Sequence, residues 1–287
     1  IAMYKRDYTD EWKQFVQGIS VASFETFPEA IAAMDRLGDA QLSPVGTLIK
    51  VVFDQTAWDN PAMANLGLER AQKGFVEWFK RSVLQMAPSR VQVDVNMSAK
   101  QTAIPMGPVG KEFAGFGRLV IPRDKADPLL DTYLKQLSKV RTRLNQLKNQ
   151  GDPGPGSLKL MRETIDGNGS EMAETLRFVD EQMLTGLPDN QRAVLRPLLV
   201  RPLLQSYAAI IRPASEELNK TWEAQVYEPF NRKLAIKYPF TAQSNIEAAP
   251  AEIAQMFGPE GAISKYVETA MGALVVRRGN TITPRTW

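Results

Sequence analysis

The 287-residue sequence contains neither cysteine nor histidine. Without cysteine the chain has no disulfides, no thiolate nucleophile and no thiolate metal ligand, which is compatible with either the cytoplasm or the periplasm. Without histidine it lacks the most common general base and the most common ligand for transition metals. Any catalysis would depend on carboxylates, lysine, tyrosine or serine. The composition therefore favours a protein that is not an enzyme and that holds no metal or cofactor.

Long apolar runs are missing as well. No stretch of about 18 uncharged apolar residues occurs, so the sequence predicts no membrane-spanning segment. No signal peptide precedes the first helical pattern, which is already under way at Ile1. We therefore interpret the chain as a piece of a longer protein.

Strong net charge is a third absence. The net charge of the chain is only +3, which is too small for a nucleic-acid-binding protein unless the positive charge is focused on one face. The stretch 127–149 does focus it, because five basic residues against two acidic ones give a net +3 there. We favour a solvated helix face for this stretch, with an acidic partner as the second interpretation. Nucleic acid is the third, because no aromatic side chains alternate with the bases.

The common phosphate-binding and catalytic motifs are absent. Residues 107–111 resemble a P-loop fragment, but the spacing is short and the final Ser or Thr is missing. There is no Gly-x-Ser-x-Gly and no Ser-x-x-Lys. The pairs Glu216/Glu217 and Glu163/Asp166 leave open one alternative, a periplasmic cell-wall hydrolase that uses two carboxylates. We favour solvated faces for both pairs, since charged residues on amphipathic helices are mostly exposed.

The longest helical apolar stripe lies between Leu187 and Phe240. Its members recur at three- and four-residue steps and so share one face. They are Leu199, Leu203, Tyr207, Ile210, Ile211, Leu218, Trp222, Val226 and Phe230. Four prolines interrupt the stretch and predict two or three helices end to end, with Pro202 and Pro229 in first turns and a kink at Pro213. Trp222 is expected to be a large aromatic anchor, either of the core or of an interface.

Helical periodicity covers most of the chain and predicts a mainly α, bundle-like fold. The other predicted helices are residues 3–19, 27–37, 43–53, 63–84, 109–120, 127–149, 157–165, 170–185, 251–257 and 259–273. Strand is expected only at 91–97 and as a hairpin at 275–283, where β-branched residues flank a Gly-Asn turn. The glycine- and proline-rich run 151–156 divides the chain. The predicted domains are an N-terminal helical subdomain (1–150), a C-terminal helical subdomain (151–274) and the first strands of a β domain (275–287).

A motif in the C-terminal part resembles a known family. It consists of Asn219, Trp222, Val226, Pro229, Tyr238, Pro239, Phe240, Phe257, Gly258, Pro259 and Gly261. In this order and spacing these residues resemble the TssM (IcmF) inner-membrane proteins of type VI secretion systems. Upstream, Tyr4, Tyr8 and Trp12 resemble the opening of the family's periplasmic helical region. The resemblance spans most of the chain, and the motif residues are structural in it.

The resemblance implies a periplasmic protein-interaction module without catalytic activity. Members of this family form an envelope-spanning complex with an outer-membrane lipoprotein (TssJ) and a second inner-membrane protein (TssL), and they self-associate in it. The lipoprotein contact is implied mainly for a β domain that would begin near Val275. No nucleic acid, small-molecule substrate or cofactor is implied. The chain departs from the family at Phe230, where Tyr is common, at Lys237, where Arg is usual, and at Pro213.

Overall fold

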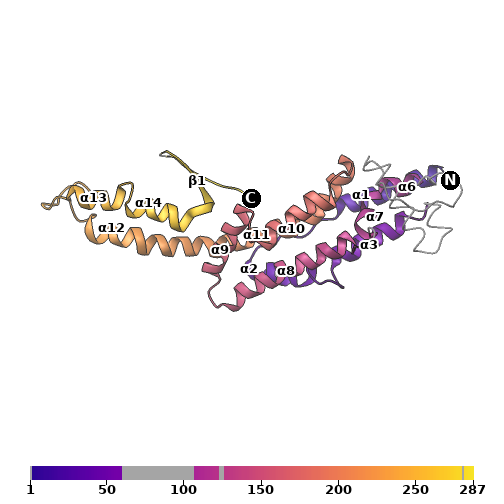
Figure 1. The fold of residues 1–287 in the computed structure, drawn as a ribbon, viewed down its shortest axis with the longest axis horizontal. Helices are drawn as coiled ribbons and strands as arrows, with labels where there is room; N and C mark the ends of the chain where they lie inside the picture. The colour runs from indigo at the N-terminus through magenta and orange to yellow at the C-terminus, as the bar shows by residue number, and fades with distance from the viewer. Residues whose placement is uncertain (1, 60–106, 123–125, 280) are drawn as a thin grey trace, which may run out of the picture. The chain divides into compact units, whose positions relative to one another are not determined.

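The computed structural model describes residues 2–59, 107–122, 126–279 and 281–287. The helix expected at 63–84 and the strand expected at 91–97 lie outside these residues. Within them the chain is mainly helical, with two short strands near the C-terminus, and this confirms the predicted fold class (Figure 1).

The chain divides into two compact units. Unit 1 comprises Ile1–Thr142 and Thr175–Ser206, and unit 2 comprises Arg143–Glu174 and Tyr207–Trp287. The domain boundaries expected from the sequence, at 150 and 274, remain a prediction. Each unit is described on its own.

Unit 1 is built from helices that begin at prolines and side-chain caps. Its elements are α1 (Ala2–Gly18), α2 (Phe27–Leu37), α3 (Pro44–Thr56), α6 (Pro108–Glu112), α7 (Ala114–Val120), the N-terminal part of α8 (Leu129–Asn149), the end of α10 (Glu171–Phe178), the π-helix η1 (Val179–Met183) and the N-terminal part of α11 (Asp189–Trp222). Thr26 and Ser43 accept backbone N–H groups in the first turns of α2 and α3, and a proline follows each cap.

Leu130, Tyr133, Leu137 and Val140 recur along α8 at three- and four-residue steps, and this apolar seam forms much of the core of unit 1. Tyr133 and Leu137 are fully buried. The Tyr133 hydroxyl donates a 2.7 Å hydrogen bond to the carbonyl oxygen of Leu199 on α11, and burial raises the pKa of this phenol. On the other side, Gly38 after α2 comes so close to α8 that an added Cβ would lie 3.0 Å from the Leu137 carbonyl oxygen.

Helix α11 runs unbroken from Asp189 to Trp222 and contains three of the four prolines discussed above, namely Pro197, Pro202 and Pro213. The prediction that Pro202 starts a new helix is therefore wrong. Proline removes one backbone N–H and costs about 3 kcal/mol in a helix interior. Burial of one face offsets that cost, because Leu199, Leu203 and Ile210 are fully buried. The predicted kink at Pro213 remains a prediction.

The helix continues into the π-helix η2 (Glu223–Tyr227) and α12 (Glu228–Lys233), where Pro229 does lie in the first turn, as predicted. Among the described residues, the run Asp189–Lys233 has a stretch that is long and apolar enough to cross a membrane, judged by length and composition only. Half of that stretch is buried inside the protein. A core helix of a soluble protein meets the same criterion.

Unit 2 contains the remaining elements. They are α9 (Pro153–Asp166), the rest of α8, α10 and α11, η2, α12, α13 (Pro250–Phe257), α14 (Ala262–Tyr266), the π-helix η3 (Val267–Met271), the 3-10 helix η4 (Gly272–Leu274), β1 (Val275–Arg278) and β2 (Thr281–Pro284). Helix α9 starts inside the glycine-proline run, four residues earlier than predicted, because Asp152 caps it by accepting the Gly154 N–H at 2.8 Å. Glycine also permits close packing here, since a Cβ on Gly156 would lie 2.4 Å from Leu147 Cδ2.

The predicted C-terminal hairpin is confirmed. β1 and β2 are antiparallel, with Val275 opposite Pro284 and Arg278 opposite Thr281. Arg285 follows the hairpin and ties it to α9, because its guanidinium donates to the Ile165 carbonyl oxygen at 3.1 Å and to Asp166 Oδ1 at 2.9 Å. A lone two-stranded hairpin is marginally stable in water, so these contacts outside it stabilise its position.

We predict that Arg285→Ala loosens the hairpin without unfolding the helices of unit 2. Loss of hydrogen bonds from a charged donor is expected to make amide hydrogen exchange in β1 and β2 about tenfold faster. Exchange at Leu158 and Leu160 of buried α9 should stay unchanged. Arg277→Ala, which changes an exposed guanidinium within the hairpin, is the control. Equal exchange rates in the Arg285 and Arg277 variants would contradict the anchoring role.

Candidate interaction surface

The motif residues of the sequence gather mostly at one end of unit 2. Asn219 and Trp222 lie on α11, Val226 on η2 and Pro229 on α12. Tyr238, Pro239 and Phe240 follow α12 in a loop whose Tyr238–Pro239 peptide bond is cis. Phe257 ends α13, and Gly258, Pro259 and Gly261 connect α13 to α14.

Three phenylalanines from different segments meet at this end. The Phe240 and Phe257 rings stack with centroids 5.8 Å apart and an angle of 17° between their planes. Phe230 meets both rings edge-on, at 5.3 Å and 6.2 Å. Such geometries are favourable beyond the apolar area they bury. The structure thus brings together Phe240 and Phe257, two motif residues that are 17 positions apart in the sequence, and adds Phe230 from α12.

The glycines of the motif allow the chain to turn tightly between α13 and α14. A Cβ on Gly258 would lie 2.5 Å from the Ala254 carbonyl oxygen, and one on Gly261 would lie 2.7 Å from the Met256 carbonyl oxygen. Both distances are shorter than the distances that real Cβ atoms keep from backbone atoms. The Gly261 N–H also donates to the Gly258 carbonyl oxygen at 2.9 Å. Because this turn directly follows Phe257, the glycines fix where that ring lies.

The loop that carries Tyr238 and Phe240 is held at both sides. The Tyr238 N–H donates to the Ile246 carbonyl oxygen at 2.8 Å, and the Tyr238 carbonyl accepts the Ala248 N–H at 2.9 Å. The Lys237 ammonium contacts both carboxylate oxygens of Glu252 on α13, at 2.7 Å and 2.8 Å. This hydrogen bond from Lys237, together with one from the Ala249 N–H, lowers the pKa of Glu252. The loop is therefore well ordered by contacts of its own.

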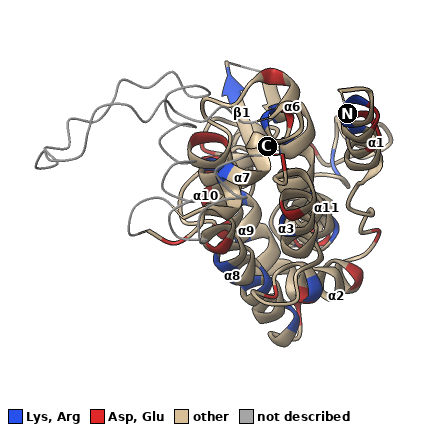
Figure 2. Cartoon of the chain, turned by 90° about the vertical axis from the view of Figure 1, so that its right-hand side faces the viewer, with Lys and Arg blue, Asp and Glu red and all other residues tan. Residues whose placement is uncertain are grey.

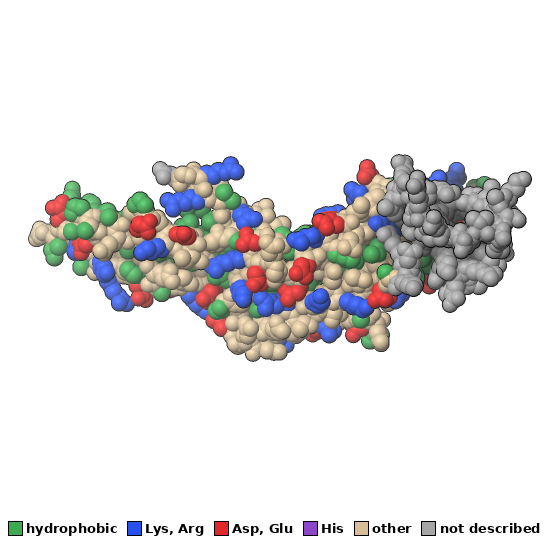
Figure 3. Space-filling model, viewed as in Figure 1, with side chains coloured by type: hydrophobic (Ala, Val, Ile, Leu, Met, Phe, Trp, Pro, Cys, Tyr) green, Lys and Arg blue, Asp and Glu red, His purple; other side chains and the backbone are tan. Residues whose placement is uncertain are grey.

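Several large apolar side chains of this region remain exposed. We call Ile236, Tyr238, Phe240, Ile246 and Phe257 the apolar tip; their exposed fractions lie between 37% and 60%. Figure 3 shows hydrophobic side chains gathered around α12 and α13. A group of exposed apolar side chains, as distinct from single scattered ones, is typical of a protein-interaction surface.

Beneath the apolar tip lies an ordinary core. Val226 is buried with Leu234, Met256, Tyr266 and Val267. Val226 is thus a packing residue of the motif rather than a contact residue.

Trp222 differs from the prediction. It is 37% exposed and meets the Tyr266 ring edge-on at 5.1 Å, so of the two predicted positions the core does not hold, and the interface stays a prediction. Ile211 of the same predicted stripe is 41% exposed. The continuous helix carries both side chains to the margin of the buried face, which spacing alone does not reveal.

The P-loop-like residues are already occupied by a carboxylate of the chain. Asp59 is buried, and its two side-chain oxygens accept the N–H groups of Val109 and Gly110 at 3.0 Å and 2.8 Å. Lys5 adds an ammonium contact at 3.4 Å. The backbone donors that a phosphate would need are therefore used, and this agrees with the failed motif.

The carboxylate pairs weighed for a hydrolase are tied to basic residues. Glu216 pairs with Arg212 at 3.2 Å, and Asp166 pairs with Arg285 at 2.9 Å. Glu163 contacts Arg143 at 3.3 Å. The side chains of Glu216 and Asp166 are 60% and 50% exposed, which fits the solvated faces that we favoured, whereas those of Glu163 and Glu217 are only 24% and 22% exposed. The described residues offer no support for the hydrolase alternative. They also contain no cluster of three or more acidic residues arranged to hold a metal ion.

The basic helix is partly neutralised within its own unit. Lys135 on α8 donates to Asp127 at 2.6 Å, which raises the pKa of the lysine and lowers that of the aspartate. Figure 2 shows the basic segments of α8 in blue, and Asp131 adds an acidic side chain in the first turn of the same helix. Mixed charge of this kind favours a solvated face over a nucleic-acid surface.

Two sequence families match parts of the chain. Residues 1–57 match the family described as "IcmF-related: Intracellular multiplication and human macrophage-killing". Residues 213–287, which include every residue of the motif, match the "Type VI secretion protein IcmF helical domain". A search of curated protein sequences finds no match.

Solved structures with a similar fold include two membrane complexes. A chain of a "Type VI secretion system membrane core complex" aligns with a TM-score of 0.70 and 20% identity, over 99% of this chain and 50% of the solved one. A chain of a "Type VI membrane complex" aligns with a TM-score of 0.63 and 19% identity, over 99% of this chain and 47% of the solved one. The chain thus spans about half the length of these chains and shares their fold.

We predict that Gly261→Ala destabilises unit 2. The new Cβ would collide with backbone at Met256, and relief of such overpacking costs about 1–3 kcal/mol of unfolding free energy. Chemical denaturation measures the change. Gly18→Ala is the control, because no atom lies within 4 Å of an added Cβ there and alanine suits a helix better than glycine. A Gly261 variant as stable as the Gly18 variant would contradict the close approach.

Proposed function

Because two segments of the chain carry IcmF-family sequence, as the resemblance in the motif predicted, we propose that it is a structural component of the envelope-spanning membrane complex of a type VI secretion system. In this role it acts through contacts with other proteins and not through catalysis. The apolar tip is the observation that carries the proposal, since the family's motif residues build an exposed surface there instead of a closed site.

The apolar tip is held in place by its neighbours, which favours binding. Its loop is fixed by the Lys237–Glu252 ion pair, and its turn is fixed by Gly258 and Gly261. Exposed apolar side chains held by a rigid frame lose little conformational entropy when a partner covers them. The stacked rings of Phe240 and Phe257 are aromatic anchors of the kind that dominate binding energy at interfaces.

The setting of this interaction follows from the family. We place the chain in the periplasm, as a segment of a protein anchored in the inner membrane, and a chain without cysteine is compatible with that compartment. The proposed partners are the outer-membrane lipoprotein TssJ, the inner-membrane protein TssL and further copies of the same protein. Neither nucleic acid nor a small-molecule substrate has a part in this proposal.

We assign the apolar tip to contacts inside the complex and the β region to the lipoprotein. The hairpin β1–β2 is anchored by Arg285, but its two strands alone present little finished surface. A lipoprotein contact through this region would need a sheet larger than the hairpin.

The contact role of the apolar tip predicts that Ile246→Glu impairs assembly of the complex. The side chain is 59% exposed, so the folded chain should keep its thermal midpoint. A charge placed in the centre of an apolar contact is expected to weaken binding about tenfold or more. Affinity purification of the complex, followed by quantification of its other subunits, measures the effect.

The matched control is Leu42→Glu, which introduces the same charge at a 79% exposed leucine of unit 1 that does not belong to the apolar tip. It should leave assembly intact. If both variants assemble as the unchanged protein does, the apolar tip is not a contact surface. If the two variants impair assembly equally, the effect is due to charge in general and the proposal fails as well.

Because we assign the lipoprotein contact to the β region and not to the apolar tip, a second prediction follows. Residues 1–287 should bind the purified lipoprotein more weakly than a chain extended through the β region, with a dissociation constant above about 1 μM for the shorter one. Isothermal titration of both chains with the same lipoprotein decides this. Tighter binding by residues 1–287 would move the lipoprotein contact to the helical units.

A further inference from the structure

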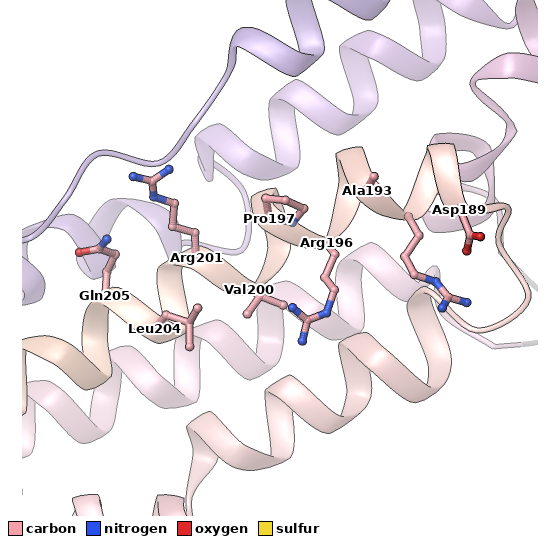
Figure 4. Close-up of a pocket in the computed structure, with 9 residues that line it drawn as sticks. Asp189, Ala193, Arg196, Pro197, Val200, Arg201, Leu204 and Gln205 are labelled. Atoms are coloured by element: carbon pink, nitrogen blue, oxygen red, sulfur yellow. The ribbon is translucent and has the colours of Figure 1, made fainter. Parts of the chain in front are cut away.

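A groove follows the exposed face of α11 in unit 1, remote in sequence from the motif residues. It has a volume of about 640 Å³. It is lined by Asp189, Arg192, Ala193, Arg196, Pro197, Val200, Arg201, Leu204 and Gln205. Figure 4 shows these residues, with Arg196 and Arg201 pointing to opposite sides of the helix.

The floor of the groove is an apolar stripe. Ala193, Pro197, Val200 and Leu204 follow one another at steps of four, three and four residues, and therefore lie along one line of the helix. Val200 is buried, whereas Leu204 is 43% exposed. The stripe covers eleven residue steps, or about 17 Å, which corresponds to three turns of a helix laid beside it. Ala193 and Pro197 are compact, so a second helix can approach α11 closely here.

The two sides of the groove are fixed by contacts within unit 1. On one side, Arg196 forms a bidentate ion pair with Asp180 of η1, at 2.9 Å and 3.1 Å. On the other side, Gln205 Oε1 accepts the Phe24 N–H at 3.0 Å, which holds the segment before α2 against α11. The groove is therefore formed before any partner arrives.

Positive charge borders the stripe on both sides. The lining contains three arginines and one carboxylate. Arg196 is neutralised by Asp180. Neither Arg192 nor Arg201 forms an ion pair with another described residue, and the helical period puts them on opposite sides of the stripe. The guanidiniums of Arg192 and Arg201 thus flank the apolar stripe and can form bidentate contacts with carboxylates of a partner.

We propose that this groove binds an acidic amphipathic helix of a partner protein. Leucine-sized side chains on one face of that helix would cover Pro197 and Leu204, while Asp or Glu on its two flanks would pair with Arg192 and Arg201. This is the helix-in-groove mode of recognition, with its anchors at steps of three and four residues. The proposal goes beyond the secretion-complex role and does not depend on the apolar tip.

A fluorescent peptide of about 20 residues tests the proposal directly. The peptide carries Leu at three- and four-residue steps and Glu on both flanks, and a second peptide has Lys in place of every Glu. Residues 1–287 should bind the Glu peptide and not the Lys peptide. Binding should weaken as salt is raised, because exposed ion pairs are screened. Equal binding of both peptides, or none of either, overturns the proposal.

The decisive experiment reverses the charge of the two arginines on the protein. Arg192→Glu with Arg201→Glu should weaken the Glu peptide about tenfold or more and create binding of the Lys peptide. The control is Arg212→Glu with Arg232→Glu, which changes the net charge equally at side chains that are 87% and 77% exposed and lie outside the groove. Unchanged thermal midpoints show that both variants fold. An equal loss in the control pair, or no new binding of the Lys peptide, contradicts the assignment.

Two further measurements distinguish other occupants. Sedimentation of residues 1–287 should show no association that the Arg192/Arg201 variant abolishes, since such association would make a second copy the occupant. Vesicles that contain phosphatidylglycerol should not compete with the Glu peptide. Competition by these vesicles would instead indicate an anionic membrane surface, and either result would overturn the proposal of a partner helix.

Discussion

Burial of one face of α11 is the constraint on which the rest of this structure depends. Three prolines within the helix each remove a backbone donor, at a cost of about 3 kcal/mol in a helix interior. A fully buried leucine or isoleucine contributes about 1.5–3 kcal/mol, and Leu199, Leu203 and Ile210 are all fully buried. The Tyr133 hydroxyl on the Leu199 carbonyl oxygen adds a hydrogen bond in the same buried layer. Packing and hydrogen bonding together keep the helix continuous.

The opposite faces of the same run carry the two surfaces that we propose for protein contacts. In unit 1 the exposed side of α11 supplies both the apolar floor and the arginines of the groove. In unit 2 the continuation through η2 and α12 carries Val226 into the core and Phe230 to the apolar tip. Both candidate surfaces are open and shaped by fixed neighbours, as suits protein contacts rather than the enclosure of a small molecule.

The charged residues fit the proposed structural role. Asp59 uses its carboxylate to cap α6, Asp152 caps α9, and Glu252 holds the loop of the apolar tip. Each of these acids satisfies backbone or ammonium donors of the chain itself, and so their work is structural. Exposed ion pairs elsewhere contribute little to stability individually. Arg192 and Arg201 in the groove of unit 1 form no ion pair with another described residue, and so they stand out against this pattern.

The sequence by itself determined the elements whose signals are local. The apolar seam of α8, the capped starts of α2 and α3, and the hairpin around Gly279 follow from periodicity and turn chemistry. The motif resembles a family whose models match two segments of the chain. The tertiary structure decided the continuity of α11 past Pro202, the early start of α9, the exposure of Trp222 and the meeting of Phe240 with Phe257. It also decided how two side chains of the groove are held, because Gln205 accepts a hydrogen bond from the Phe24 N–H and Arg196 pairs with Asp180. The physical reason is that side-chain burial and packing depend on residues distant in the chain. Helix propensity and helix capping, in contrast, involve only the nearest residues in the sequence.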